Sequence, residues 1–150
     1  MRTRLIIVSR VDSGFSRSRI DPDPGERFVS LCRQLGISSF GLNEIVLEPG
    51  QRGRIHRHER QEEVYLVLEG ALTLVIEGDE HVLERGELAR VGPEVRRQLA
   101  NGGPERLILL ALGGSGEHEG RDGLAYPDWD TPVDEGRPPQ ETPLPPDLTA

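Results

Sequence analysis

The sequence predicts a single all-β domain, a barrel or sandwich of about eight short antiparallel strands with one short helix before them. Three observations lead to this fold class. The chain has 150 residues and a mass of 16.6 kDa, the usual size of one domain with one core. Hydrophobic residues make up 35% of it and aromatic residues only 4%, so Leu, Val and Ile must build the core. Short apolar or alternating runs recur along the chain at regular intervals, without helices between them.

The N-terminal part, residues 1–39, is expected to supply one strand and the helix. Leu5 to Val8 form a short apolar run that suits a strand. From Asp23 to Gly36 the period becomes helical, because apolar residues recur at spacings of three and four: Phe28, Leu31, Cys32 and Leu35. Pro24 suits a first helical turn and Gly36 suits a C-terminal cap. We therefore expect one helix over residues 23–36, packed on the barrel.

Eight strands are predicted after this helix. They cover residues 39–47, 53–58, 63–69, 71–77, 80–84, 87–91, 95–100 and 106–112. Turn-forming residues separate them, among them Pro49-Gly50, Gly78-Asp79 and Gly92-Pro93. Residues 40–112 are therefore predicted to form the barrel.

An acidic, proline-rich tail follows over residues 113–150. It holds nine of the 26 acidic residues and two of the 18 basic ones, so it carries −7 of the net charge of −8. Seven of the 12 prolines lie in the last 24 residues. Such a composition cannot offset the entropy of ordering, so we expect the tail to be largely flexible and Asp130 onward to be dispensable for stability.

The composition excludes several classes of function. The first 112 residues are almost neutral, which gives no electrostatic footprint for nucleic acid and no basic amphipathic stretch for a membrane surface. The run at Leu5 to Val8 is too short for a signal-peptide core or a membrane span, so we expect a cytoplasmic protein. Cys32 is the only cysteine, which excludes an internal disulfide and a Cys-pair metal or redox site. The absence of Lys excludes Schiff-base chemistry.

A group of candidate metal ligands lies near the middle of the chain. Two of the four histidines, His56 and His58, fall in one predicted strand that turns them and Arg54 to the same face. Glu63 shares a face with Tyr65 and Val67 in the next strand. Two imidazoles and one carboxylate coordinate iron, manganese or zinc and leave positions open for substrate.

Two alternatives to this site are open at the level of sequence. The three side chains would be solvated polar groups if they lay at a sheet rim. Glu62 would replace Glu63 if the strand register slipped by one residue. The slip would also turn Tyr65 and Val67 out of the core, so Glu63 is preferred.

The spacing of these residues resembles the first motif of the cupin superfamily. Its positions are Gly50, His56, His58, Glu63 and Gly70, with five, one, four and six residues between them. A second, similar motif runs from Gly86 to Asn101 but departs from the family pattern. It has Gly92 where proline is usual, Glu94 where glycine is usual and Arg97 where histidine is usual. The resemblance covers about residues 40–112.

This resemblance implies a double-stranded β-helix, or jelly-roll, barrel. By the same resemblance His56, His58 and Glu63 are ligands of a divalent metal ion (Fe, Mn, Zn or Ni), and Arg97 occupies the place of the missing fourth ligand. An arginine stays protonated and cannot bind a metal, so its charge repels the ion.

Cupin folds host dioxygenases, isomerases, decarboxylases and passive sugar-binding or sensing modules, so the fold does not select a reaction. Our leading hypothesis is a small metal-dependent enzyme, dioxygenase- or isomerase-like, acting on a small anionic molecule. For substrate binding we expect Arg97 and Arg54 to hold a carboxylate or phosphate, with Tyr65 nearby. The competing hypothesis is a metal-free, non-catalytic module that binds or senses a small ligand. No catalytic residue is assigned.

We also expect a homodimer. Single-domain cupins resemble one another in pairing through their sheets, and a near-neutral barrel with uncovered strand edges has a physical reason to do likewise.

Overall fold

The computed structural model describes residues 14–116, 118 and 124–146, which belong to two compact units, Met1–Ser115 and Gly116–Ala150. The described part of the first unit contains eight strands and one α-helix. They are β1 (Phe28–Ser30), α1 (Leu31–Leu35), β2 (Gly41–Leu47), β3 (Glu62–Glu69), β4 (Ala71–Ile76), β5 (Asp79–Glu84), β6 (Leu88–Val91), β7 (Arg97–Ala100) and β8 (Leu107–Gly114). The described residues of the second unit contain two short 3-10 helices, η1 (Val133–Glu135) and η2 (Pro139–Glu141).

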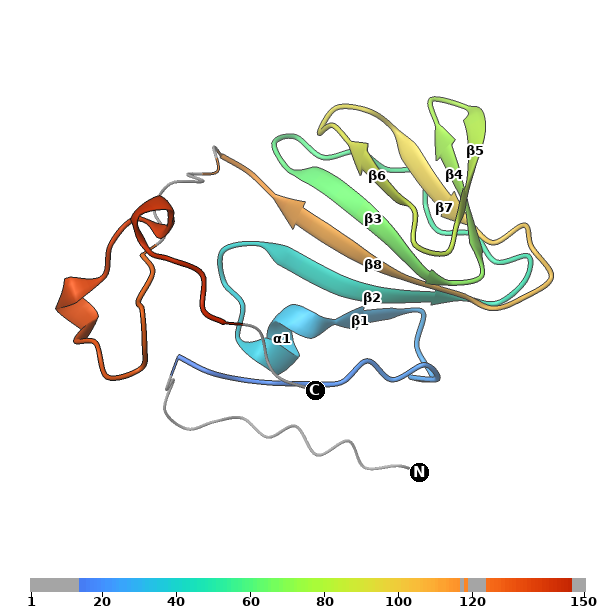
Figure 1. Ribbon diagram of the computed structural model, residues 1–150. Coiled ribbons are helices and arrows are strands. Elements are labelled where there is room, and N and C mark those ends of the chain that lie inside the picture. Colours follow the sequence, from blue (N-terminus) through green and yellow to red (C-terminus); the bar gives the residue numbers. More distant parts are fainter. Residues whose placement is uncertain (1–13, 117, 119–123, 147–150) are drawn as a thin grey trace. The chain divides into compact units, whose positions relative to one another are not determined.

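The strands of the first unit form two antiparallel sheets (Figure 1). One sheet has five strands in the order β1-β2-β8-β3-β6, and the other has three in the order β5-β4-β7. Some neighbours come from distant parts of the chain, since β8 lies between β2 and β3 and β7 pairs with β4. This arrangement confirms the predicted all-β jelly-roll fold with very little helix.

The core lies between the two sheets and is aliphatic, as the composition predicts. Strands from both sheets turn alternate residues toward it. Its most buried members include Tyr65, Val67, Leu72, Leu107 and Leu109, each at most 1% exposed. The face of β3 that carries Tyr65 and Val67 also carries Glu63, so the core fixes the direction of this carboxylate.

The predicted helix over residues 23–36 is wrong in extent. Only Leu31–Leu35 are helical, because Phe28–Ser30 instead pair with β2 and form β1. The Ser30 side chain caps the helix by accepting a hydrogen bond from the Arg33 N–H. Gly36 ends the helix as predicted, in the left-handed conformation with φ of 73°, and its N–H donates to the Cys32 carbonyl.

The predicted strand over residues 53–58 is also wrong. The connection between β2 and β3 forms only isolated bridges there, Arg52 with Ala100 and His56 with Arg97. Both bridges join this segment to the edge strand β7, so the segment is paired only at intervals and does not form a regular ladder.

Several predictions are not decided by these elements. Leu5 to Val8 lie outside the described residues. The three-part division at residues 39 and 112 stays a prediction, and so does the flexibility of the tail. Neither α1 nor any other helix in the described part of the chain has the length and apolarity needed to cross a membrane.

Candidate metal centre

The histidine segment is held against β7 by backbone hydrogen bonds. The His56 N–H donates to the Arg97 carbonyl and the Arg97 N–H donates to the His56 carbonyl, both at 2.9 Å. The His58 N–H donates to the Pro93 carbonyl, also at 2.9 Å. These bonds fix the backbone at His56 and at His58, so both imidazoles lie beside Glu63 although neither residue is part of a regular strand.

The structure brings His56, His58 and Glu63 together. The Nε2 atom of His58 lies 2.8 Å from Glu63 Oε1, and the Nε2 atom of His56 lies 3.5 Å from the same oxygen. One ligand atom from each residue lies within 4.8 Å of the others. The two imidazole side chains are 37% and 32% exposed, whereas that of Glu63 is 10% exposed. The group is therefore anchored in the barrel and open on the histidine side.

These separations suit a shared metal ion. Two ligands bound at about 2.1 Å to one ion, at an angle near a right angle or a tetrahedral angle, lie about 3.0–3.5 Å apart. The distances of 2.8 and 3.5 Å from Glu63 Oε1 to the two histidines are close to that range. Three protein ligands also leave coordination positions open, as in catalytic rather than structural sites.

A second contact sets the orientation of His56. Its Nδ1 atom lies 3.1 Å from the Arg54 carbonyl oxygen. If Nδ1 carries the proton and donates it to this oxygen, the Nε2 lone pair is free to bind a metal. The backbone of Arg54 thus positions a ligand. Its side chain, which we expected to contact substrate, is exposed.

The guanidinium of Arg97 lies behind the carboxylate and not at the mouth of the site. Its side chain is fully buried, and Nη2 lies 3.4 Å from Glu63 Oε1. Nη1 donates to the carbonyls of Val95, at 2.7 Å, and Pro93, at 3.3 Å. Nη2 also donates to the Gly92 carbonyl. Among the described residues, Nε has no hydrogen-bond partner. Arg97 therefore acts on the site through Glu63 and cannot reach a ligand directly in this conformation.

Tyr65 is a further neighbour of the same oxygen. Its hydroxyl donates to Glu63 Oε1 at 2.8 Å, and the residue is 1% exposed. Burial raises the pKa of Tyr65 well above 10, and the charge of Glu63 raises it further. The phenol is therefore a neutral hydrogen-bond donor that orients the carboxylate.

The register of β3 places Glu63, and not Glu62, in the site. Glu62 is on the other face, where its carboxylate accepts a hydrogen bond from Arg90 Nε.

Sequence reasoning missed the role of the Gly92–Val95 turn, whose carbonyls hold the guanidinium of Arg97. The Gly92-Pro93 turn signal marked the turn, but no sequence pattern predicts where its carbonyls point.

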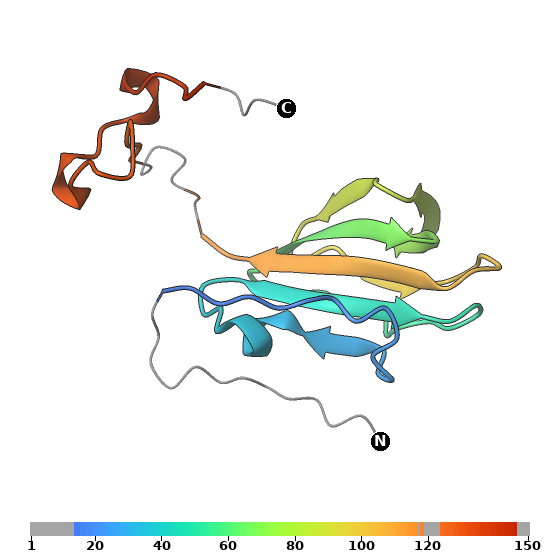
Figure 2. The ribbon, with the colours of Figure 1, turned by 60° about the horizontal axis from the view of Figure 1, so that its bottom comes forward.

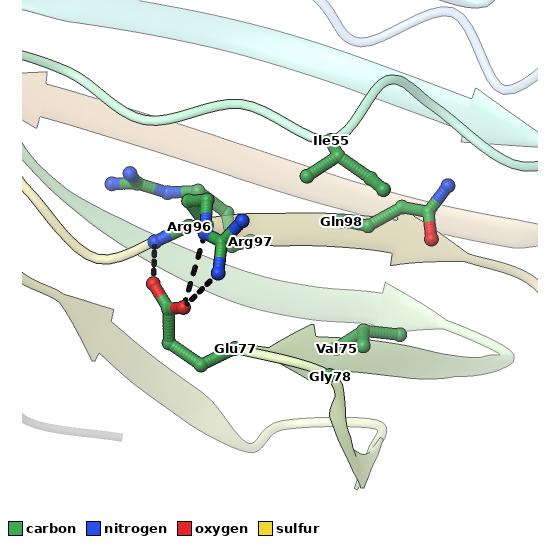
Figure 3. A pocket seen from close by; sticks show the side chains of 7 residues that line it. All are labelled: Ile55, Val75, Glu77, Gly78, Arg96, Arg97 and Gln98. Carbon is green, nitrogen blue, oxygen red and sulfur yellow. Dashed lines mark hydrogen bonds and ion pairs between the residues drawn. The ribbon is translucent and has the colours of Figure 1, made fainter.

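A small pocket of about 230 Å³ is lined by Ile55 and by residues of β4, β7 and their neighbouring turns, Arg97 among them (Figure 3). Ile55, Val75 and Gln98 border it, and Arg96 closes one end by pairing with Glu77. The Arg96 pair lowers the pKa of Glu77. None of the three candidate ligands lines this pocket.

The family-model match and the similar solved structures both point to cupin proteins. A sequence-family model for the cupin domain matches residues 43–113. A cupin protein from Bacteroides fragilis is similar in structure, with a TM-score of 0.65 and 22% identity over 74% of this chain and 97% of its own. At that identity the likeness shows the fold alone.

Two solved structures are more similar in sequence. A sugar phosphate isomerase of the cupin superfamily from Silicibacter pomeroyi is 30% identical, with a TM-score of 0.54, over 59% of each chain. A putative sugar phosphate isomerase from Acidithiobacillus ferrooxidans is also 30% identical, with a TM-score of 0.53, over 57% of this chain and 56% of its own. The chain thus spans little more than half the length of either protein. No curated protein matches it.

Proposed function

Because residues 43–113 are a cupin domain and the chain belongs to the cupin superfamily, we propose that it is a small metal-dependent enzyme that acts on a small anionic molecule. The observation that carries this proposal is the convergence of His56, His58 and Glu63, with donor atoms within 4.8 Å of one another. The ion would be Fe, Mn, Zn or Ni, since all four accept imidazole and carboxylate ligands.

Each residue of the site has a role in this proposal. The metal would supply Lewis acidity that polarises an oxygen of the bound molecule or, if it is redox-active, would activate dioxygen. His56 and His58 would hold it from the more exposed side of the site, and Glu63 would hold it from the buried side. Tyr65 and Arg97 keep the carboxylate of Glu63 in position.

Two observations support an anionic ligand. The connection between β2 and β3 carries Arg54 and Arg57 on either side of His56, and both are exposed. Guanidinium groups bind phosphate and carboxylate in a bidentate manner. The two solved structures that are 30% identical are a sugar phosphate isomerase and a putative one, and such substrates combine a phosphate with oxygens that a metal can polarise. We therefore propose a phosphorylated or carboxylated small molecule as the substrate class.

The second candidate is a metal-free module that binds or senses a small ligand. It is favoured by the ion pair of Arg97 with Glu63, because a buried cation 3.4 Å from the carboxylate already neutralises the ligand that a metal needs.

Elemental analysis distinguishes the two candidates. Untagged protein purified without chelator should contain close to one equivalent of a transition metal. His56→Ala and His58→Ala should lose it, while His81→Ala, an exposed histidine on β5, should retain it. Less than about a tenth of an equivalent, also after incubation with each of the four metals, would contradict the enzyme and favour the binding module.

The anionic class is tested by calorimetry on the metal-loaded protein. A sugar phosphate should bind more tightly than the same sugar without phosphate, and the double substitution Arg54→Ala and Arg57→Ala should remove the difference. Equal binding of both sugars would contradict an anionic ligand.

A further inference from the structure

The inner face of the five-stranded sheet changes from aliphatic to small and polar beside the candidate metal centre. β3, β8 and β2 are neighbours in this sheet (Figures 1 and 2), and their register defines rows of facing residues across it. The row within the core is aliphatic and consists of Val67, Leu109 and Ile45. The next row consists of Tyr65, Ala111 and Asn43, and the last consists of Glu63, Gly113 and Gly41. The sheet therefore carries little side-chain volume next to the carboxylate of Glu63.

Gly113 is a glycine because of its neighbour and not because of its backbone. It lies inside β8, and its φ is not in the left-handed region that favours glycine. A Cβ atom at this position would lie 2.6 Å from Cδ of Gln61, which is closer than side-chain carbons approach one another. The side chain of Gln61 therefore lies across Gly113. Because Gly113 pairs with Glu63, the amide of Gln61 lies on the face of the sheet that carries this candidate ligand.

Gln61 and Asn43 are half-buried, and their side-chain amides make no hydrogen bond within the described part of the chain. Asn101 shows how a structural amide differs from them. It is 1% exposed, and its Nδ2 donates to the carbonyls of Leu47 and Glu105, both at 2.8 Å. Buried polar groups are normally paired in this way. The amides of Gln61 and Asn43 instead keep two donors and one acceptor each for water or a ligand.

We propose that Gln61 and Asn43 bind hydroxyl groups of the molecule held at the candidate metal centre, so that its substrate class is a polyhydroxylated carboxylate or phosphate. This inference rests on the proposed function, because it places the anionic end of the same molecule at the metal and the exposed arginines. A hydroxyl group both donates and accepts hydrogen bonds, so it satisfies the N–H and C=O groups of an amide alike. A second carboxylate only accepts, and it would leave the amide carbonyls unpaired.

The positions of the two amides set their relative importance. Neighbouring strands lie about 4.8 Å apart, so the row from Glu63 to Gly41 is about 10 Å long. Gln61 lies over the middle member of this row, Gly113, whereas Asn43 belongs to the next row and to the strand farther from Glu63. A molecule of sugar size that is bound at Glu63 therefore reaches Gln61 before Asn43. We expect Gln61 to contribute more to hydroxyl recognition.

Calorimetry with gluconate and hexanoate tests this proposal, because these six-carbon monocarboxylates differ in their hydroxyl groups. The natural protein should bind gluconate at least about tenfold more tightly, since hexanoate leaves the amides unpaired. Gln61→Met keeps the length of the side chain and Gly113→Ala displaces the amide, so each should reduce this preference at least about fivefold. Asn43→Ala should reduce it less. Gly114→Ala is the matched control, because a Cβ atom there meets only Phe40 Cβ among the described residues, at an ordinary 3.9 Å.

Two results would overturn the proposal. The first is a natural protein that binds both acids equally or binds neither. The second is a Gln61→Met variant that keeps the full preference while circular dichroism shows that it is folded. Each titration is run on metal-free and on metal-loaded protein, which separates this test from that of the enzyme. A natural protein that takes up no metal would contradict the enzyme, whereas a preference that Gln61→Met loses and Gly114→Ala keeps would still support hydroxyl recognition by Gln61.

Discussion

The guanidinium of Arg97 lies 3.4 Å from Glu63 Oε1. The same oxygen accepts a hydrogen bond from the Tyr65 hydroxyl and contacts both histidines. One carboxylate oxygen thus serves two purposes, since it is the only anionic candidate ligand of the site and the counter-charge of a buried arginine. A metal bound there must share this oxygen with a cation. This competition leads to the first two predictions.

Arg97→His should bind a divalent metal at least tenfold more tightly than the natural protein, or by about 1.4 kcal/mol. The substitution removes the charge beside Glu63 and places an imidazole on β7 directly opposite His56 in the bridge. Metal affinity is measured by calorimetry or by competition with a chromophoric chelator. Arg96→His is the matched control, because Arg96 is the neighbouring residue and pairs with Glu77 on the outside.

Unchanged metal affinity in Arg97→His would mean that the guanidinium does not oppose the ion. In that case the metal-free arrangement of Arg97 and Glu63 differs from the one that binds metal.

Glu63→Gln should be less stable than the natural protein by about 3 kcal/mol, because the substitution leaves the Arg97 charge buried without an anionic partner. Urea denaturation monitored by circular dichroism measures the change. Glu62→Gln is the control: its carboxylate pairs with Arg90 at an exposed position, so the loss should stay below about 1 kcal/mol. Equal losses in the two variants would show that the buried pair contributes nothing beyond a surface pair.

Most of the strands could be predicted from local patterns. Turn residues and apolar alternation fix β4 and β5 because the two strands form a hairpin and pair with each other. The pattern of β3 is visible in the sequence too, although its partners β6 and β8 come later in the chain. β1 was missed because Phe28–Ser30 are extended only through pairing with residues 43–45, and the same residues also fit a helical period. The segment 53–58 was predicted as a strand because its composition alternates, but a strand also needs a continuous partner.

The spacing of His56, His58 and Glu63 was visible in the sequence, and the structure brings their ligand atoms together. The contacts that decide how this site behaves were not visible. The position of the Arg97 guanidinium depends on carbonyls of Gly92, Pro93 and Val95, and backbone carbonyls have no sequence signature. The exposure of Arg54 follows from the absence of a regular strand in its segment.

Tyr65 gives a prediction about alkaline stability. Burial and the charge of Glu63 raise the pKa of its phenol in the folded state above the ordinary value of 10.0. Below pH 10 the phenol is protonated in both states, so its contribution to stability is fully present. Above pH 10 the unfolded chain loses this proton while the folded protein keeps it, so stability falls by up to about 1.4 kcal/mol per pH unit.

Tyr65→Phe isolates this effect. The variant loses the hydrogen bond to Glu63 and should be about 1–2 kcal/mol less stable at pH 7. Its deficit relative to the natural protein should shrink between pH 10 and pH 11, because only the natural protein has Tyr65 to titrate. Denaturation curves at pH 8, 10 and 11 measure the difference. A deficit that stays constant over this range would contradict the shifted pKa.

The last prediction concerns the acidic unit, Gly116–Ala150, whose described hydrogen bonds are internal. The Tyr126 hydroxyl donates to the Val133 carbonyl, and Ala125 and Arg137 form a backbone bridge. Its large apolar residues are exposed, with Trp129 at 104% and Leu144 at 93%, so it buries little apolar surface. A chain that ends at Ser115 should therefore keep the melting temperature of the full chain within about 2 °C, measured by calorimetry. Deletion from Asp130 onward should give the same result, because the two described contacts that it breaks, Tyr126 with Val133 and Ala125 with Arg137, lie within the acidic unit. A fall of more than about 5 °C, or roughly 1–2 kcal/mol for a domain of this size, would show that the acidic unit stabilises the barrel.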